Sequence, residues 1–344
     1  MTMRACFDRS APLSSPPMSK TVFSLLALVA LSACGGGGED AGSASSLRFI
    51  SIGTAPPGGA FFVVGGALGE VLNQHGPGWE VTAEATKGSQ ENIRRLESGE
   101  LDIALSNAAI TYFAVRGEGS WEKAYGIRSV MTLAPNVAMF VAPRDSGVAS
   151  IADIRGKRAV VGPAGAGWES FVRPIVEAHG VTYDDFTPLN NTQAGAVDNL
   201  ADGSVAAAFL GGAVPTASIV QASTSQDILL VPFDETARAE LVTNYPFFYE
   251  RTVPAGTYRG QDEDYHGLDV GSMHLVASVK ADEELIYQIT KTIYQNRESV
   301  TEIHPAGNFI NPENVVRDTG VEFHSGAIRF YREIGIWPET DDES

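Results

Sequence analysis

Short apolar runs alternate with amphipathic stretches along most of the chain. Residues 49–52 and 158–161 are runs of this kind, and helical spacing of apolar residues follows each of them, at 61–73 and 168–179. Strands covered on both faces form continuous apolar runs, because the helices between them pack on the two sides of the sheet. The pattern therefore predicts an α/β fold with parallel strands.

The same reasoning assigns the other elements. The predicted strands are residues 49–52, 80–85, 103–105, 130–133, 137–141, 158–161, 205–210, 228–232 and 273–279. Residues 185–189 form either a further strand or a loop. Predicted helices are residues 61–73, 90–98, 151–154, 168–179, 194–202, 214–222 and 283–297.

Two of the apolar runs, 137–141 and 273–279, flank a complete set of strand and helix units. Two extended segments on either side of such a set predict a pair of strands that cross between two lobes. Roughly 290 residues are also more than one hydrophobic core usually spans. We expect the domains to be lobe 1 (47–139 plus 275–337), lobe 2 (140–274) and an acidic tail (338–344).

The N-terminus has the pattern of a targeting segment. Lys20 provides a basic start, residues 21–31 are apolar, and Leu31-Ser32-Ala33-Cys34 is a small-residue cleavage site. This predicts a lipoprotein signal peptide (1–33), lipidation of Cys34 and a flexible glycine-rich tether (34–46). Cleavage without lipidation is the alternative. Met18 opens a complete signal by itself, so the true start codon is either Met1 or Met18.

Charge and cysteine content exclude several classes of function. The formal net charge is −18, which argues against binding nucleic acid or anionic lipid through charge. Cys6 precedes the predicted cleavage site, so the mature chain keeps only Cys34. A disulfide within the chain, a thiolate metal site and a cysteine nucleophile are therefore excluded. We expect a membrane-anchored protein of the periplasm or cell envelope.

Catalytic motifs are missing from the sequence. It contains no H-E-x-x-H and no G-x-S-x-G, and residues 162–170 lack the lysine of a phosphate-binding P-loop. The six histidines show no ligand spacing, and Asp262-Glu263-Asp264 is typical of an acidic surface loop. We expect neither an enzyme nor a metal or cofactor; a periplasmic hydrolase is the disfavoured alternative.

Three segments repeat one pattern: a strand, a turn of small residues and a helix start, at 47–69, 81–96 and 158–180. The first turn of a helix leaves N–H groups unpaired and carries partial positive charge, which suits an anion. Any one of them alone is also an ordinary turn of an α/β fold, but three together indicate one shared anionic ligand. The expected ligand-binding residues are Gly53, Thr54, Gly58, Gly59, Phe62, Thr86, Lys87, Gly88, Ser89, Asn92, Ser106, Asn107, Gly165, Ala166, Gly167 and Trp168.

Several of these residues have a structural alternative. Ser89 is a suitable helix N-cap, with Asn92 three residues later. Lys87 either compensates the charge of a ligand or lies in solvent. Ser106 and Asn107 follow the run 103–105, at the carboxyl end of a strand, where ligands of open α/β sheets bind.

Several motifs follow one another in order along the chain: I-G-T-x-x-x-G-G (52–59), T-x-G-S-x-E-N (86–92), D-S-G-x-x-S-x-A-D-I-R-G-K-R-x-V-V-G (145–162), V-P-A-G-T-Y-x-G-Q (253–261), D-E-E-L-I-Y-Q-I-T-K (282–291) and F-H-S-G-A-I-R-F-Y-R-E-I-G (323–335). In these motifs the chain resembles the TAXI-type solute receptors of tripartite ATP-independent periplasmic (TRAP) transporters over almost its whole mature length.

The resemblance implies a type II periplasmic-binding-protein fold, in which two α/β lobes joined by crossing hinge strands close on a ligand cleft. It also implies a small organic-acid ligand, such as a dicarboxylate, a keto acid or a glutamate-like amino acid. The implied partner is a TRAP permease driven by an ion gradient. A lipoprotein of this fold that senses a ligand and reports to a membrane kinase is the alternative.

Two departures from the family pattern bear on the ligand. The third loop usually resembles G-S-G-T, but this chain has Gly165-Ala166-Gly167-Trp168, and it has Phe61-Phe62 where the family tends to have two tyrosines. Fewer hydroxyl groups suit a less polar acid, such as a keto acid or an aromatic carboxylate. In the alternative, Trp168 turns outward or packs in lobe 2.

Overall fold

The computed structural model describes residues 47–57 and 59–338, which lie in one compact unit. The predicted signal peptide, the tether with Cys34, Gly58 and residues 339–344 lie outside the described residues. Within the described ranges, no helix has the length and apolar character needed to cross a bilayer.

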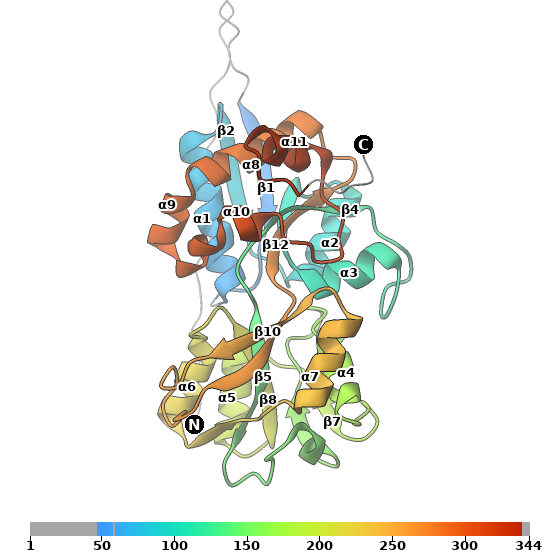
Figure 1. Ribbon diagram of the computed structural model, residues 1–344, viewed down its shortest axis with the longest axis vertical. Coiled ribbons are helices and arrows are strands. Elements are labelled where there is room, and N and C mark those ends of the chain that lie inside the picture. The colour runs from blue at the N-terminus through green and yellow to red at the C-terminus, as the bar shows by residue number, and fades with distance from the viewer. Residues whose placement is uncertain (1–46, 58, 339–344) are drawn as a thin grey trace, which may run out of the picture. The chain divides into compact units, whose positions relative to one another are not determined.

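The first lobe is built on a five-stranded mixed sheet. β1 pairs in parallel with β2 and β3, whereas β12 is antiparallel to β3 and β4. In Figure 1 this lobe combines blue N-terminal segments with orange and red C-terminal ones. The strand order is β2 (Trp79–Glu84), β1 (Arg48–Gly53), β3 (Ile103–Asn107), β12 (Met273–Ser278), β4 (Ile127–Thr132). Its helices are α1 (Ala60–His75), α2 (Ser89–Ser98), α3 (Ala108–Arg116), α8 (Glu283–Gln295), α9 (Arg297–Ile303), α10 (Pro312–Val315) and α11 (Ser325–Glu333), with a 3-10 helix at Pro305–Phe309.

The second lobe has a seven-stranded mixed sheet, drawn mainly in green to gold in Figure 1. β6 is parallel to β7 and β8, whereas β5 is antiparallel to β8, β9 and β11. The strand order is β10 (Phe248–Val253), β11 (Tyr265–Val270), β5 (Val137–Pro143), β8 (Ala207–Gly212), β6 (Arg158–Val160), β7 (Thr187–Leu189), with β9 (Ile228–Leu230) on β5. The helices are α4 (Glu169–Ala178), α5 (Gln193–Ala201), α6 (Ala217–Ser225) and α7 (Glu235–Asn244), with a 3-10 helix at Ile151–Ile154.

Two chain segments cross between the sheets and pair with each other. The segment between β4 and β5 runs antiparallel to the segment between β11 and β12. Their backbone bonds include Leu133 N–H to Met273 O (2.8 Å), Met273 N–H to Ala134 O (2.9 Å) and Val270 N–H to Asn136 O (2.9 Å). The predicted architecture, two α/β lobes joined by crossing segments, is therefore confirmed.

The apolar core forms two clusters: one lies between the first sheet and helices α1, α8 and α11, and the other joins residues of α2, α3 and the first sheet to the core of the second lobe. Helix α3 follows β3 of the first lobe, and its buried Ile110 belongs to the cluster that includes the core of the second lobe. Tyr112 and Phe113 of α3 also pack on Phe247, with ring centroids 5.1 and 5.8 Å apart. Helix α3 is therefore a packed contact between the lobes.

Some predicted elements differ from the structure. We predicted parallel strands, and the strands do pair in parallel in the groups β2-β1-β3 and β8-β6-β7. The other strands pair antiparallel, because the crossing strands β5 and β12 enter the sheets in the opposite direction. The helix predicted at 214–222 begins at Ala217; before it, the N–H of Thr216 donates to the Tyr258 hydroxyl (2.9 Å). The lobe boundaries at 139/140 and 274/275 stay a prediction; the nearest strands are β5 and β12.

Candidate functional site: a cleft at four helix starts

A cavity of about 290 Å³ lies where the two lobes meet. It is bordered by the carboxyl ends of β3 and β8, through Asn107, Gly211 and Gly212, at the edge where open α/β sheets bind ligands. Its lining residues are Ala55, Pro56, Pro57, Gly59, Ala60, Phe61, Lys87, Gly88, Ser89, Asn107, Asn136, Pro163, Ala166, Trp168, Thr192, Gln193, Ala194, Gly211 and Gly212. We call this cavity the cleft.

Four helices begin at the cleft. The N-cap residues of α1, α2 and α4 are Gly59, Gly88 and Trp168, and none of the three helix starts receives a side-chain cap. Only α5 is capped, by the Thr192 hydroxyl, which accepts the N–H of Gly195. Unpaired N–H groups and the positive ends of the helix dipoles therefore converge on one cavity from both lobes.

The turn before α2 depends on a glycine. Gly88 has φ +111°, a conformation that is strained for other residues. A Cβ atom there would lie 3.9 Å from the Cβ of Ala166 in the second lobe. The starts of α2 and α4 therefore approach each other across the cleft.

Ser89 and Lys87 supply polar groups to the cleft. The Ser89 Oγ accepts the backbone N–H of Asn107 (2.9 Å), and no described residue accepts its hydroxyl hydrogen. Among the described lining residues, Lys87 is the one cationic side chain, and none is an aspartate or glutamate. The described part of the cleft therefore offers donors and positive charge but no carboxylate.

The apolar wall of the cleft includes Trp168 and Phe61. The Trp168 ring packs on Phe171 and Phe209, with centroids 5.6 and 6.2 Å apart. It also covers Gly162, where a Cβ atom would lie 2.6 Å from the indole. Trp168 thus packs in the second lobe and lines the cleft at the same time. Phe61, rather than the predicted Phe62, is the phenylalanine in the lining.

Three predicted polar residues hold the backbone together behind the cleft. The Thr54 hydroxyl donates to the backbone carbonyl of Glu84 (2.7 Å), and the backbone carbonyl of Thr54 accepts the Thr86 hydroxyl (3.0 Å). Asn92, which is 0% exposed, donates to the carbonyls of Thr54 (2.7 Å) and Leu105 (2.8 Å). These side chains fix the ends of β1 and β3, and they do not line the cleft.

Asn107 and Ser106 connect the cleft to the crossing segments. Asn107 caps α3, because its Oδ1 accepts the N–H groups of the next turn, and its Nδ2 donates to Gly271 O (2.6 Å). The Ser106 hydroxyl lies 2.8 Å from the Thr111 hydroxyl, which lies 2.8 Å from Nε2 of His274. Burial lowers the pKa of His274 to about 3, so the ring is neutral.

A buried carboxyl group lies beside the crossing segments. Asp269 accepts the backbone N–H of Asn136 (3.0 Å) and the Ser272 hydroxyl, and Arg317 forms an ion pair with it at 3.6 Å. Burial raises the pKa of the Asp269 carboxyl, against the opposing effect of the Arg317 charge. This cluster ties the C-terminal part of the first lobe to β11 of the second lobe.

The structure brings about half of the predicted residues to the cleft. Those in the lining are Gly59, Lys87, Gly88, Ser89, Asn107, Ala166 and Trp168. Those outside the lining are Gly53, Thr54, Phe62, Thr86, Asn92, Ser106, Gly165 and Gly167. Gly58 lies outside the described residues. A Cβ atom on Gly53 would lie 2.7 Å from Asn92 Oδ1, and one on Gly167 would lie 3.2 Å from Ile110 in the first lobe, so both pack against protein.

Sequence reasoning missed the start of α5, the end of β8 and Asn136. The signal for α5 was present, because Asn190-Asn191-Thr192 forms a polar turn between a strand and a helix. Asn136 lies just before a predicted crossing strand, with no motif around it.

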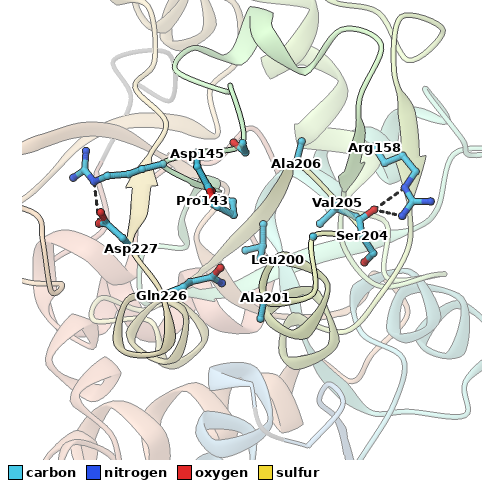
Figure 2. A pocket seen from close by; sticks show the side chains of 13 residues that line it. Pro143, Asp145, Arg158, Leu200, Ala201, Ser204, Val205, Ala206, Gln226 and Asp227 are labelled. Atoms are coloured by element: carbon cyan, nitrogen blue, oxygen red, sulfur yellow. Dashed lines mark hydrogen bonds and ion pairs between the residues drawn. The ribbon is translucent and has the colours of Figure 1, made fainter.

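A larger hollow of about 720 Å³, which we call the outer hollow, lies at the other end of β8, where the strand begins. Figure 2 shows its lining near Pro143, Arg158 and Ser204. Arg144 pairs with Asp227 at 3.0 Å, and Arg158 donates to the Ser204 carbonyl, so both guanidinium groups are engaged. Among the described residues, no group of three or more His, Cys, Asp or Glu side chains is arranged to hold a metal ion.

Known proteins similar to this chain share its fold. A binding-protein component of a phosphonate ABC transporter from Pseudomonas aeruginosa is 13% identical, with 76% of this chain and 79% of that chain covered and a TM-score of 0.51. A protein structure from Bordetella bronchiseptica RB50 is 14% identical, with 86% and 91% covered and a TM-score of 0.51. The model of the NMT1-like family matches residues 52–335. The chain therefore belongs to the NMT1-like family, a family of periplasmic solute-binding proteins.

Proposed function

We propose that the protein is an extracytoplasmic receptor that binds a small organic anion in the cleft and delivers it to a membrane permease. The lining of the cleft carries the proposal. Uncapped starts of α1, α2 and α4 meet there beside Lys87 and away from any lining carboxylate, in a chain with a net charge of −18. Such a site favours negative charge through local donors, against the field of the whole protein.

The cleft also limits the size and polarity of the ligand. Its volume of about 290 Å³ is near the lower end for ligand pockets, which is roughly 300 Å³. Phe61, Trp168 and three prolines make part of the wall apolar. Candidate ligands are therefore dicarboxylates, keto acids and glutamate-like amino acids, with a preference for an acid that has an apolar body.

For the permease we propose the TRAP type, because the ordered sequence motifs resemble those of TAXI receptors. In this proposal, lipid on Cys34 anchors the receptor in the cell envelope. An ABC transporter is the second candidate, because the similar protein from P. aeruginosa is a component of one.

Calorimetry tests the binding proposal. Residues 34–344, with Cys34→Ser to avoid lipidation, are titrated with mono- and dicarboxylates, sulfonates and phosphonates. Saturable heat from one class of anion supports the proposal, and no heat from any of them contradicts it. Uptake of the bound anion by cells then separates the permeases: a TRAP system stops when the ion gradient collapses, and an ABC system stops when ATP is depleted.

A further inference from the structure

The crossing segment between β4 and β5 carries a buried polar side chain that the fold does not use. Asn136 is 7% exposed and lines the cleft. Its backbone is fixed on both sides, because its N–H donates to Asp269 (3.0 Å) and its carbonyl accepts the N–H of Val270 (2.9 Å). Its side-chain amide makes no hydrogen bond with any described residue.

An unpaired amide at such a buried position calls for a partner. A buried polar group without a hydrogen bond costs about 1–3 kcal/mol. The Oδ1 of Asn92 has no hydrogen bond and is fully buried, so no ligand can reach it. The amide atoms of Asn136 are not fully buried in this way. The cleft is the accessible space that Asn136 borders. A bound ligand can therefore supply the missing partner.

Asn136 and Ser89 belong to one hydrogen-bonded floor of the cleft. The Ser89 Oγ accepts from Asn107 N–H (2.9 Å), and the Asn107 side chain donates to Gly271 O (2.6 Å) next to Val270. The Asn107 Oδ1 accepts backbone N–H groups of α3, and its Nδ2 donates to the carbonyls of Gly271 (2.6 Å) and Val270 (3.4 Å), so its donors are engaged within the protein. The floor thus presents two unused functions, the Ser89 O–H and the Asn136 amide.

The charge of the lining excludes one kind of ligand group. No aspartate or glutamate lines the described part of the cleft, so a ligand ammonium group would have no carboxylate partner there. The buried carboxyl of Asp269 already accepts from the Asn136 N–H and the Ser272 hydroxyl, and it forms an ion pair with Arg317. An unpaired ammonium buried in the cleft would be strongly disfavoured.

We infer that Asn136 determines specificity by bonding to an uncharged oxygen next to the carboxylate of the ligand. This inference rests on the proposed function and narrows its ligand class to 2-hydroxy and 2-oxo acids, at the expense of amino acids. An amide offers two N–H donors and one acceptor, which suit both a hydroxyl and an oxo oxygen.

The test uses matched ligands that differ in one substituent. Calorimetry compares 3-phenylpropanoate with its 2-hydroxy and 2-amino derivatives, and a second set built on 4-methylpentanoate covers aliphatic acids. We expect the 2-hydroxy acid to bind about tenfold more tightly than the unsubstituted acid. The 2-amino acid should bind at least about tenfold more weakly than the 2-hydroxy acid.

Variants of Asn136 assign the preference to this side chain. Asn136→Ala should bind the hydroxy and unsubstituted acids equally, and its melting temperature without ligand should stay within about 2 °C of the wild type, because no intramolecular bond is lost. Asn136→Asp should reverse the order and favour the amino acid. Asn244→Ala, at an exposed position at the end of α7, is the matched control and should leave the order unchanged.

The two proposals fail in different ways. If the wild type binds the three matched acids equally, or if Asn136→Ala keeps the preference for the hydroxy acid, the inference about Asn136 is wrong and the anion receptor stands. If no anion of the wider panel binds the wild type, the proposed function itself is wrong.

Discussion

Helix α5 and strand β8 each run from the cleft toward the outer hollow. The cleft, of about 290 Å³, meets the N-terminal end of α5 at Gln193 and the carboxyl end of β8 at Gly212. The outer hollow, of about 720 Å³, meets the opposite ends, at Ala201 and Ala206 (Figure 2). The larger hollow therefore lies where the backbone presents the C-terminal end of a helix and the starting end of a strand.

This difference decides which hollow suits an anion. The C-terminal end of α5 carries partial negative charge, and Asp145 and Asp227 line the outer hollow as well. Its arginines, Arg144 and Arg158, are occupied by protein oxygens. The cleft has fewer cations in its described lining, but three helix starts without a side-chain cap border it. Backbone polarity, rather than volume or the number of cations, therefore identifies the candidate anion site.

The largest expected effect comes from blocking the two ends of the same helix. Ala194 and Ala201 are both exposed, one at each end of α5. Ala194→Trp fills the cleft, so we expect at least about 100-fold weaker binding of the best anion in calorimetry. Ala201→Trp is the matched control in the outer hollow and should change affinity less than twofold. The opposite pattern would assign the ligand to the outer hollow.

The wall behind the cleft should make stability depend on pH. His274 is buried beside Thr111, and burial lowers its pKa to about 3. Below pH 6.5 His274 takes up a proton in the unfolded chain but stays neutral in the folded protein. The free energy of unfolding therefore decreases as the pH drops from 6.5 toward 3. The loss is about 1.4 kcal/mol for each pH unit.

Chemical denaturation between pH 7 and 5 checks this loss. In His274→Gln we expect the slope of the unfolding free energy against pH to decrease by the equivalent of about one proton. His75→Gln, at an exposed position at the end of α1, should keep the slope of the wild type. An unchanged slope in His274→Gln would contradict the neutral buried ring.

Removal of one donor from the cleft should weaken binding moderately. Ser89→Ala deletes the hydroxyl hydrogen that no described residue accepts, so we expect about tenfold lower affinity for the best anion. The variant also leaves the N–H of Asn107 without its acceptor, at a cost of about 1–3 kcal/mol in unfolding free energy. Ser98→Ala, at the exposed end of α2, is the control for both measurements. Unchanged affinity in Ser89→Ala would remove this hydroxyl from the site.

The smallest effect concerns cations. Lys87 is exposed at the edge of the cleft, so Lys87→Gln should lower anion affinity by about threefold, and less at high salt. Arg144→Gln removes a cation from the outer hollow and should have no effect on affinity. Calorimetry at two salt concentrations checks both variants. A larger loss from Arg144→Gln than from Lys87→Gln would reverse the comparison.

The sequence predicted the fold well where one element follows another through a turn. The alternation of apolar runs and helical spacing found α1, α2, α4, α5 and α8 and most strands. It missed α3, because Asn107 is both the last residue of β3 and the N-cap of the helix, with no turn between them. It also missed β10 and β11, which pair with each other across the long connection 254–264.

For the site, the sequence located the loops better than the side chains. Strand ends and helix starts are local patterns, so the loops around Gly59, Gly88 and Trp168 were predicted. Which polar side chains face the cleft depends on packing between distant segments. Thr54 and Asn92 bond to backbone carbonyls, whereas Asn136 borders the cleft only because two crossing segments pair there.

A crystal structure with the tightest-binding anion of the panel tests the central claim most directly. We predict that the negative group of the ligand lies within hydrogen-bond distance of first-turn N–H groups of α1, α2, α4 or α5, inside the cleft. A ligand held by Arg144 or Arg158 in the outer hollow, with the cleft empty, would contradict the account.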